Sequence, residues 1–213
     1  MRHIEAIVFD MDGVLVDARE WHFLALNKAL GLFGYTISPE EHKTDFDGLP
    51  TRRKLEILSS RNGLPLGMHD FINELKQKYT VELIHEFCRP SFQHQYTLKQ
   101  LKIEKYRLGL ASNSIMATIT LMMEKTALSE YLDVVVSAEN VTQGKPSPEI
   151  YQKIFSDLKL EACQVVVVED NENGIKAASL SGAHVFEVED PTMVSIDLIR
   201  TFINKIEDEN CKQ

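Results

Sequence analysis

Five short runs of apolar, mostly β-branched residues limit most strongly how this chain can fold. The runs are Ala6 to Phe9, Leu108 to Ala111, Val134 to Val136, Val165 to Val168 and Val185 to Val188. Runs that are apolar on both faces are typical of buried parallel strands. Helix-like segments with start signals lie between the later runs, after Ser114, Ser147-Pro148 and Asn171. The alternation predicts an α/β fold with a Rossmann-like parallel sheet.

The stretch from about residue 15 to 90 has no strand-like run, although it separates the first predicted strand from the second. Its apolar residues recur at helical spacing, as at Phe23, Leu26 and Leu30. We therefore expect residues 1–15 and 90–213 to form an α/β core domain. Residues 16–89 are expected to form a helical cap domain, inserted after the first strand.

Composition and charge argue against several classes of protein. The 213 residues are 44% hydrophobic and carry a net charge of -9, which disfavours nonspecific binding to nucleic acid or to an anionic membrane. We see no signal peptide and no apolar run that could span a bilayer. The three cysteines are widely separated, which favours free thiols in a reducing compartment. We predict a cytoplasmic protein with no nucleic-acid or membrane partner. The sequence does not determine the oligomeric state, and a monomer is compatible with it.

Polar residues follow the first, second and fourth predicted strands. They are Asp10 and Asp12, then Ser112 and Asn113, then Glu169 and Asp170, with Lys145 in the loop after the third strand. In an open α/β sheet, ligands bind beyond the carboxyl ends of the strands, so these side chains are expected to converge. Asp10 and Asp12 are two positions apart and are expected to face one space.

Such a cluster of carboxylates needs positive charge. Two like charges about 4 Å apart repel by about 4 kcal/mol at an effective dielectric constant near 20. A divalent cation together with the ammonium of Lys145 would relieve the repulsion, and carboxylate oxygens favour Mg²⁺. Ser112 and Lys145 could also hold an anion, so the set has the parts needed for phosphoryl transfer.

Each of these residues has a commoner explanation when it is considered alone. Asp12 with Gly13 is a frequent turn signal, Asp170 could be a helix cap, and Lys145 could be a solvated lysine. His22 lies at helical spacing in an amphipathic segment and could simply be packed. The convergence of several motifs at one edge favours a functional site.

Four segments of the chain resemble, in order and in spacing, the motifs of the haloacid dehalogenase-like hydrolases. They are DMDGVLVD, LASNS, GKPSPEIY and VVVEDNENG. The helical insert resembles the subgroup of that family with a cap after the first strand, which includes β-phosphoglucomutase-like and phosphatase members. One segment departs from the pattern: CRPSFQHQY has Pro90 but no glycine after it, which leaves the exit hinge between residues 86 and 96 open.

The resemblance implies roles for the acidic residues. Asp10 is expected to attack phosphorus and form an aspartyl-phosphate. Asp12 is expected to protonate the leaving oxygen and then to activate water. Mg²⁺ is expected to be held by Asp10, the backbone carbonyl of Asp12 and Asp170, with Glu169 assisting directly or through water.

The resemblance also implies contacts to the substrate. Ser112, Asn113 and Lys145 are expected to bind the phosphoryl oxygens, with Lys145 also counted as catalytic. Arg52, in the first turn of a predicted cap helix, and His22 are the candidates for contact from the cap.

The function expected from these features is a Mg²⁺-dependent phosphatase that acts on a small phosphorylated metabolite, with a sugar phosphate favoured. A phosphosugar mutase is the alternative, since it differs only in what accepts the phosphoryl group from Asp10, and His22 does not decide between the two. A non-catalytic phospho-receiver module is less favoured because receivers lack a long helical insert. A dehalogenase is also disfavoured, because that reaction needs no metal.

Overall fold

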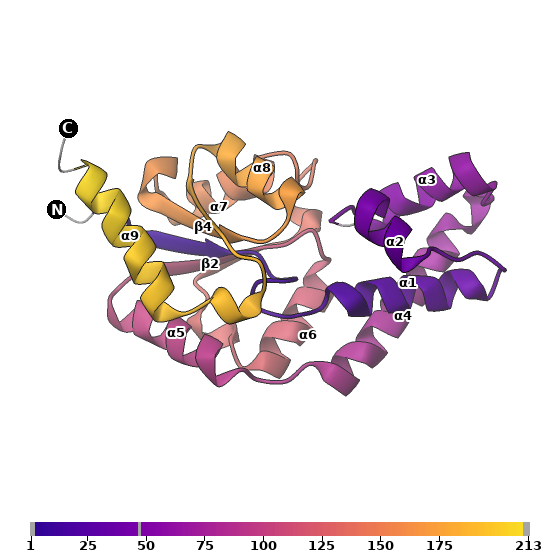
Figure 1. Cartoon of the computed structure of the whole chain (residues 1–213), viewed down its shortest axis with the longest axis horizontal. Helices are drawn as coiled ribbons and strands as arrows, with labels where there is room; N and C mark the ends of the chain where they lie inside the picture. Colours follow the sequence, from indigo (N-terminus) through magenta and orange to yellow (C-terminus); the bar gives the residue numbers. More distant parts are fainter. Residues whose placement is uncertain (1–2, 47, 211–213) are drawn as a thin grey trace. The chain divides into compact units, whose positions relative to one another are not determined.

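The chain folds into two compact units in a computed structural model that describes residues 3–46 and 48–210 (Figure 1). One unit contains the described residues up to Asp17 and from Arg89 onward. The other unit is Ala18–Cys88. Each unit is described here by itself.

The first unit is built on a parallel sheet of five strands. The strands are β1 (Ala6–Phe9), β2 (Arg107–Ala111), β3 (Val134–Val136), β4 (Val165–Glu169) and β5 (His184–Glu187), in the spatial order β3-β2-β1-β4-β5. All neighbouring pairs are parallel. The predicted fold class is therefore confirmed, and each strand lies within one residue of its predicted run.

The register of the sheet aligns the strands that carry the polar residues. Val8 on β1 is opposite Gly109 on β2 and Val167 on β4. β1 and β4 are buried along their whole length, as expected for central parallel strands. A Cβ on Gly109 would lie 3.2 Å from side-chain atoms of Val8 and Val134, so a glycine here allows close packing against the neighbouring strands.

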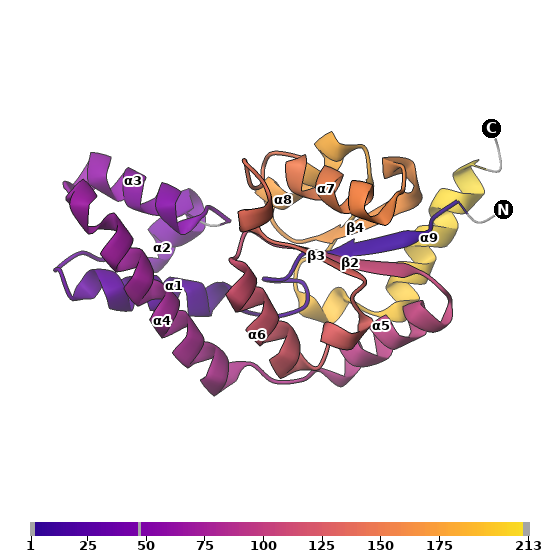
Figure 2. The ribbon, with the colours of Figure 1, turned by 180° about the vertical axis from the view of Figure 1, so that it is seen from behind.

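Helices cover both faces of this sheet (Figures 1 and 2). The helices are α5 (Phe92–Ile103), α6 (Met116–Thr126), α7 (Glu149–Leu158), α8 (Glu172–Ser181) and α9 (Ile196–Asn210). Figure 1 shows α7 and α8 on one face and α5, α6 and α9 on the other. Ile150, Tyr151 and Ile154 of α7 pack with Val8 and Val167 of the sheet in one apolar core.

Two of the predicted helix starts need correction. The N-cap of α6 is Ile115 and that of α7 is Pro148, one residue after the predicted Ser114 and Ser147. Ser147 still accepts a hydrogen bond from the amide of Glu149, the first residue of α7, at 3.4 Å. Ser114 uses its hydroxyl for another contact, which is described below. Asn171 caps α8 as predicted, because its side chain accepts a hydrogen bond from the amide of Asn173.

The second unit contains helices and no strand among its described residues. The helices are α1 (Arg19–Gly31), α2 (Pro39–Glu41), α3 (Thr51–Asn62) and α4 (His69–Phe87), with a π-helical segment at His42–Phe46. Leu26, Leu30, Leu55 and Ile72 form part of its buried core. The expected helical insert after the first strand is therefore present.

The segment that departs from the family pattern forms the start of α5. Ser91 is the N-cap and its side chain accepts a hydrogen bond from the amide of His94. The His94 ring, which is buried, lies 3.1 Å from the carbonyl oxygen of Leu15 and 2.9 Å from that of Pro191. The imidazole therefore links the start of α5 to two loops of the same unit.

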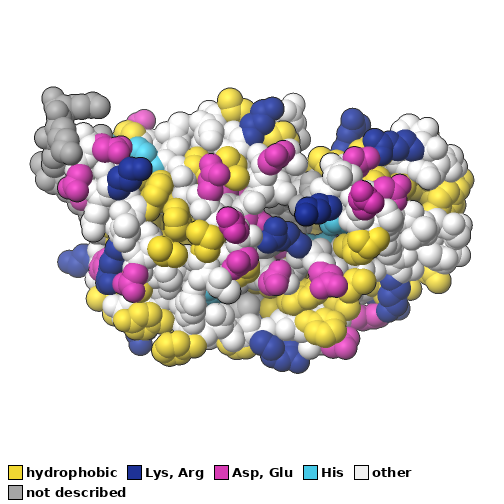
Figure 3. Space-filling model, in the orientation of Figure 1, with side chains coloured by type: hydrophobic (Ala, Val, Ile, Leu, Met, Phe, Trp, Pro, Cys, Tyr) yellow, Lys and Arg dark blue, Asp and Glu magenta, His cyan; other side chains and the backbone are white. Residues whose placement is uncertain are grey.

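The surface carries charges of both signs, and the described cysteines are free thiols. Figure 3 shows Lys and Arg side chains dispersed among Asp and Glu on the face that it presents. Cys88 and Cys163 are free thiols, whereas Cys211 lies outside the described residues. Within residues 3–46 and 48–210, no helix has the length and apolarity needed to cross a membrane.

Candidate functional site

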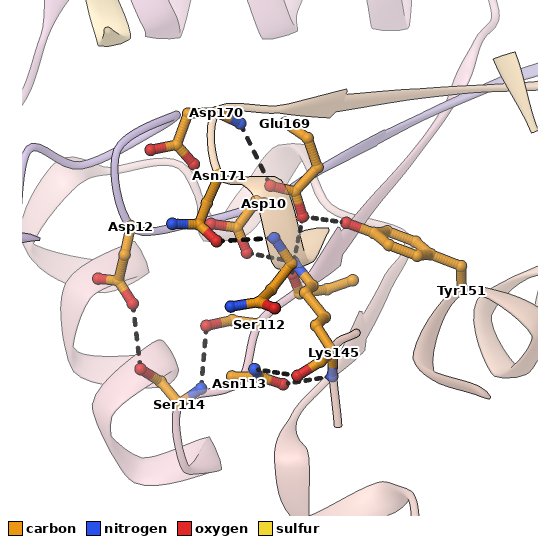
Figure 4. A network of polar contacts seen from close by, with 12 residues as sticks. Asp10, Asp12, Ser112, Asn113, Ser114, Lys145, Tyr151, Glu169, Asp170 and Asn171 are labelled. Carbon is orange, nitrogen blue, oxygen red and sulfur yellow. Dashed lines mark hydrogen bonds and ion pairs between the residues drawn. The ribbon is translucent and has the colours of Figure 1, made fainter. Parts of the chain in front are cut away.

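The carboxyl ends of three neighbouring strands bring polar side chains together. Asp10 follows β1, Ser112 follows β2 and Glu169 is the last residue of β4. Lys145 reaches the same place from the loop between β3 and α7 (Figure 4). The parallel order β2-β1-β4 makes this convergence necessary, because all three strands end at one edge of the sheet.

The ammonium of Lys145 is the centre of the site. It donates hydrogen bonds to Asp10 Oδ1 at 2.5 Å, to Glu169 Oε1 at 2.5 Å and to the carbonyl oxygen of Ala111 at 2.9 Å. Lys145 is only 6% exposed. Burial acts to lower its pKa, but the carboxylates of Asp10 and Glu169 outweigh burial and raise the pKa above its ordinary value. The lysine is therefore charged at neutral pH.

The charge on Asp10 is less favoured. Burial raises the pKa of Asp10 well above its ordinary value, against the attraction of Lys145, and the charges of Glu169 and Asp12 raise it further. The single positive charge of Lys145 does not balance the negative charges of Asp10, Glu169 and Asp12. A further positive charge near Asp10 would favour its ionised form, which is the nucleophilic one.

A group of three carboxylates could hold such a charge. One oxygen each of Asp10, Glu169 and Asp170 lie within 4.8 Å of one another. Both carboxylate oxygens of Asp170 are shielded from solvent. Hard carboxylate donors that converge from loops and strand ends suit Mg²⁺, so the donor set fits the predicted metal.

Asp12 is not one of these three carboxylates, although its charge is among those that raise the pKa of Asp10. The Oδ2 of Asp12 accepts a hydrogen bond from the hydroxyl of Ser114 at 3.1 Å (Figure 4). The chain leaves β1 after Phe9 and turns here, with Gly13 at a φ of 89°. The sequence places Ser114 after the second strand and at a predicted helix start, but it did not indicate this contact.

Ser112 and Asn113 follow β2, and both contact protein groups. Ser112 is buried, and its hydroxyl oxygen accepts a hydrogen bond from the amide of Ser114 at 3.1 Å. The Asn113 side chain accepts from the amide of Lys145 at 2.9 Å and donates to the Lys145 carbonyl oxygen at 3.3 Å. A Cβ on Gly144 would lie 2.4 Å from Asn113 Oδ1, so the glycine makes this close contact possible.

Tyr151 is a member of the site that sequence reasoning missed. It lies on α7, is fully buried, and donates a hydrogen bond from its hydroxyl to Glu169 Oε1 (Figure 4). Burial, followed by the charges of Glu169 and Asp10, raises the pKa of Tyr151 well above its ordinary value, so the hydroxyl remains protonated. The signal for Tyr151 was its place at the end of GKPSPEIY, but its helical spacing also fits a core residue.

The two residues predicted to contact substrate from the cap lie in the helical unit. His22 is on α1, with its Nδ1 3.2 Å from Nζ of the buried Lys76 on α4. Lys76 was not identified from the sequence. The side chain of Arg52, in the first turn of α3, is 90% exposed and forms an ion pair with Glu56 at 3.5 Å.

Comparisons of this chain with known proteins agree on one family. The family model of the haloacid dehalogenase-like hydrolases matches residues 7–188. A phosphorylated carbohydrates phosphatase of Thermotoga maritima is 30% identical over 182 residues, covering 84% of this chain and 82% of that protein. A phosphoglycolate phosphatase of Aquifex aeolicus is 27% identical over 180 residues, with 84% and 82% covered. A crystal structure of β-phosphoglucomutase from Clostridium difficile has a TM-score of 0.82 at 22% identity and covers 95% of this chain and 98% of its own.

Gly174 provides a test of how closely the site is packed. A Cβ at this position would lie 2.1 Å from the Glu169 carboxyl group, so Gly174→Ala must displace the carboxylate or the first turn of α8. We expect a loss of about 1–3 kcal/mol in the free energy of unfolding, measured by urea denaturation. Gly31→Ala is the matched control, because Gly31 also lies in a helix and has nothing within 4 Å of the added methyl group. Equal stability of the two variants would contradict the packing described here.

Proposed function

This chain belongs to the haloacid dehalogenase-like hydrolase family and is an enzyme of the phosphatase class; we propose that it hydrolyses a small phosphorylated metabolite, a sugar phosphate, with Mg²⁺ as its cofactor. The observation that carries the proposal is the buried Lys145 ammonium bonded to Asp10, the carboxylate that would attack. The named activities of the two relatives support the substrate class.

The carboxylates divide the proposed reaction between them. An Asp10 oxygen attacks phosphorus, the bond from phosphorus to the ester oxygen breaks, and that oxygen takes a proton from Asp12. A water molecule then returns a proton to Asp12 while its oxygen attacks the phosphorus of the aspartyl-phosphate, which releases Asp10. The different surroundings support the different roles, because Asp10 lies against an ammonium and Asp12 against a hydroxyl.

The other residues of the site would bind and orient the reactants. Asp10, Asp170 and Glu169, with the backbone carbonyl of Asp12, would hold Mg²⁺, which supplies positive charge for the phosphoryl oxygens. The phosphoryl group would also be bound by the ammonium of Lys145 and by Ser112. For Asn113 we now favour a positioning role, because its side chain holds the Lys145 loop by two hydrogen bonds.

The helical unit is proposed to act as a mobile cap that selects the substrate and excludes water, corresponding to residues 16–89. Its insertion between β1 and β2 and its own apolar core support this role. Arg52 and His22 remain the proposed contacts from the cap. For the compartment we propose the cytoplasm, because Cys88 and Cys163 are free thiols.

A screen of phosphorylated metabolites tests the proposed function. We expect release of inorganic phosphate from at least one sugar phosphate, and we expect the release to stop when EDTA removes Mg²⁺. Incubation with hexose 1-phosphates and a bisphosphate primer separates the alternatives, because a mutase returns an isomer and a phosphatase returns free phosphate. An isomer as the main product would favour the mutase, and stable phosphorylation without turnover would favour a receiver module.

The Asp10→Asn variant tests the nucleophile. Because an amide cannot form the aspartyl-phosphate, we expect turnover to fall by about three orders of magnitude or more, measured as phosphate release under saturating substrate. Asp157→Asn is the control, since Asp157 is an exposed partner of Lys153 on α7 and its loss removes only a surface ion pair. Substantial turnover by Asp10→Asn would show that another group attacks phosphorus.

The Asp170→Ala variant tests the metal site. Removal of one carboxylate from the group of three is expected to raise the Mg²⁺ concentration for half-maximal activity by about 10-fold to 100-fold. Glu172→Ala, an exposed acidic residue in the first turn of α8, provides the control and should leave the titration unchanged. An identical metal titration for Asp170→Ala and the wild type would remove Asp170 from the site.

A further inference from the structure

The Lys145 ammonium has already used all of its hydrogen-bonding capacity within the protein. A lysine ammonium has three N–H donors and no acceptor. The three donors are directed at Asp10 Oδ1, Glu169 Oε1 and the Ala111 carbonyl oxygen. Lys145 can therefore donate to a phosphoryl oxygen only if it releases one of these acceptors.

Glu169 is an acceptor that has two further hydrogen-bond donors. Its Oε1 accepts a second hydrogen bond, from the Tyr151 hydroxyl, and its Oε2 accepts one from the amide of Asp170 at 3.2 Å. Glu169 is 1% exposed, so water does not replace a donor that leaves. With Tyr151 in place, Oε1 keeps a partner when Lys145 moves away.

The position of Tyr151 is fixed by its surroundings. Its ring lies in the apolar core between α7 and the sheet, and the Lys145 ammonium lies 5.1 Å from the ring centroid. The Glu169 carboxyl group is confined on another side by Gly174, where a Cβ would lie 2.1 Å away. The hydroxyl and the carboxylate therefore stay aligned without help from Lys145.

We propose that Tyr151 is a positioning residue whose hydroxyl keeps Glu169 hydrogen-bonded while Lys145 turns from Glu169 to the phosphoryl group of the substrate. This inference rests on the proposed function, in which Lys145 binds that group. Without the hydroxyl, the departure of Lys145 would leave Glu169 Oε1 buried and without a donor, so the lysine would remain on Glu169. Tyr151 thereby affects anion binding through Lys145 and has no contact of its own with the substrate.

The Tyr151→Phe variant tests the inference, because it deletes the hydroxyl and retains the ring. We expect the dissociation constant for inorganic phosphate, measured by calorimetry in saturating Mg²⁺, to rise about 10-fold or more, with a similar fall in kcat/KM for p-nitrophenyl phosphate. The melting temperature of the phosphate-free protein and its Mg²⁺ affinity should change little, because Lys145 still satisfies Glu169 in that state. Tyr96→Phe is the matched control, since Tyr96 is an exposed tyrosine on α5 and should leave every measurement unchanged.

A merely structural role for Tyr151 predicts the opposite pattern, in which the melting temperature falls and phosphate affinity is retained. That result would overturn the inference. Wild-type protein that binds no phosphate and hydrolyses no ester would overturn the proposed function together with the inference. Normal wild-type binding and turnover with an equally tight Tyr151→Phe variant would overturn the inference alone.

A crystal structure of the wild type with phosphate and Mg²⁺ tests the same point without any variant. We expect the Lys145 Nζ to Glu169 Oε1 distance to lengthen beyond about 3.5 Å while the Tyr151 hydroxyl stays bonded to Oε1. A structure in which Lys145 keeps Glu169 and releases Asp10 or Ala111 would contradict the inference.

Discussion

A single buried ammonium, that of Lys145, holds together the groups that the proposed chemistry needs. It links Asp10 at the end of β1 with Glu169 at the end of β4, and it also bonds the last residue of β2 through the Ala111 carbonyl oxygen. One side chain therefore joins three adjacent strands at their carboxyl ends. The apolar interior of the sheet keeps water from the lysine, which strengthens each of these bonds and makes the loss of any one of them costly.

The groups around Lys145 are held by contacts that leave little space for change. Asn113 binds the amide and the carbonyl of Lys145, and its Oδ1 lies where a Cβ on Gly144 would be. The Glu169 carboxyl group likewise lies where a Cβ on Gly174 would be. At Gly144 and Gly174, therefore, the lack of a Cβ allows a side chain of the site to approach the backbone closely.

The fold was predictable because its signals are local or follow from topology. Runs that are apolar on both faces identified each strand to within one residue, and alternation with helices made the sheet parallel. Once the sheet is parallel, the residues that follow β1, β2 and β4 must meet, so the convergence of Asp10, Ser112 and Glu169 required no knowledge of side-chain positions. The hydrogen bond from Ser114 to Asp12 was not predicted, because it forms where the chain turns after β1.

Other features of the site depend on packing that a sequence does not encode locally. Tyr151 has the spacing of a core residue, and its hydroxyl becomes part of the site only because α7 packs beside β4 and Glu169. The pairing of His22 with Lys76 joins residues that are 54 positions apart on two helices of the other unit. The predicted cap at Ser114 failed for a related reason, since its hydroxyl donates to Asp12, a residue far away in the sequence.

The balance of charge at the strand ends links metal binding to the reactivity of Asp10. The carboxylates of Asp10, Glu169 and Asp170 with the ammonium of Lys145 sum to two negative charges when all are ionised. Burial, followed by the charges of Glu169 and Asp12, raises the pKa of Asp10 against the attraction of Lys145, so a proton and a divalent cation would compete for the Asp10 carboxylate. A bound dication would cancel the excess and lower the pKa of Asp10, and the ionised carboxylate is the form that could act as a nucleophile. In the proposed reaction the same dication would also supply positive charge for the phosphoryl oxygens, so its binding would favour both the anionic substrate and the ionised form of Asp10.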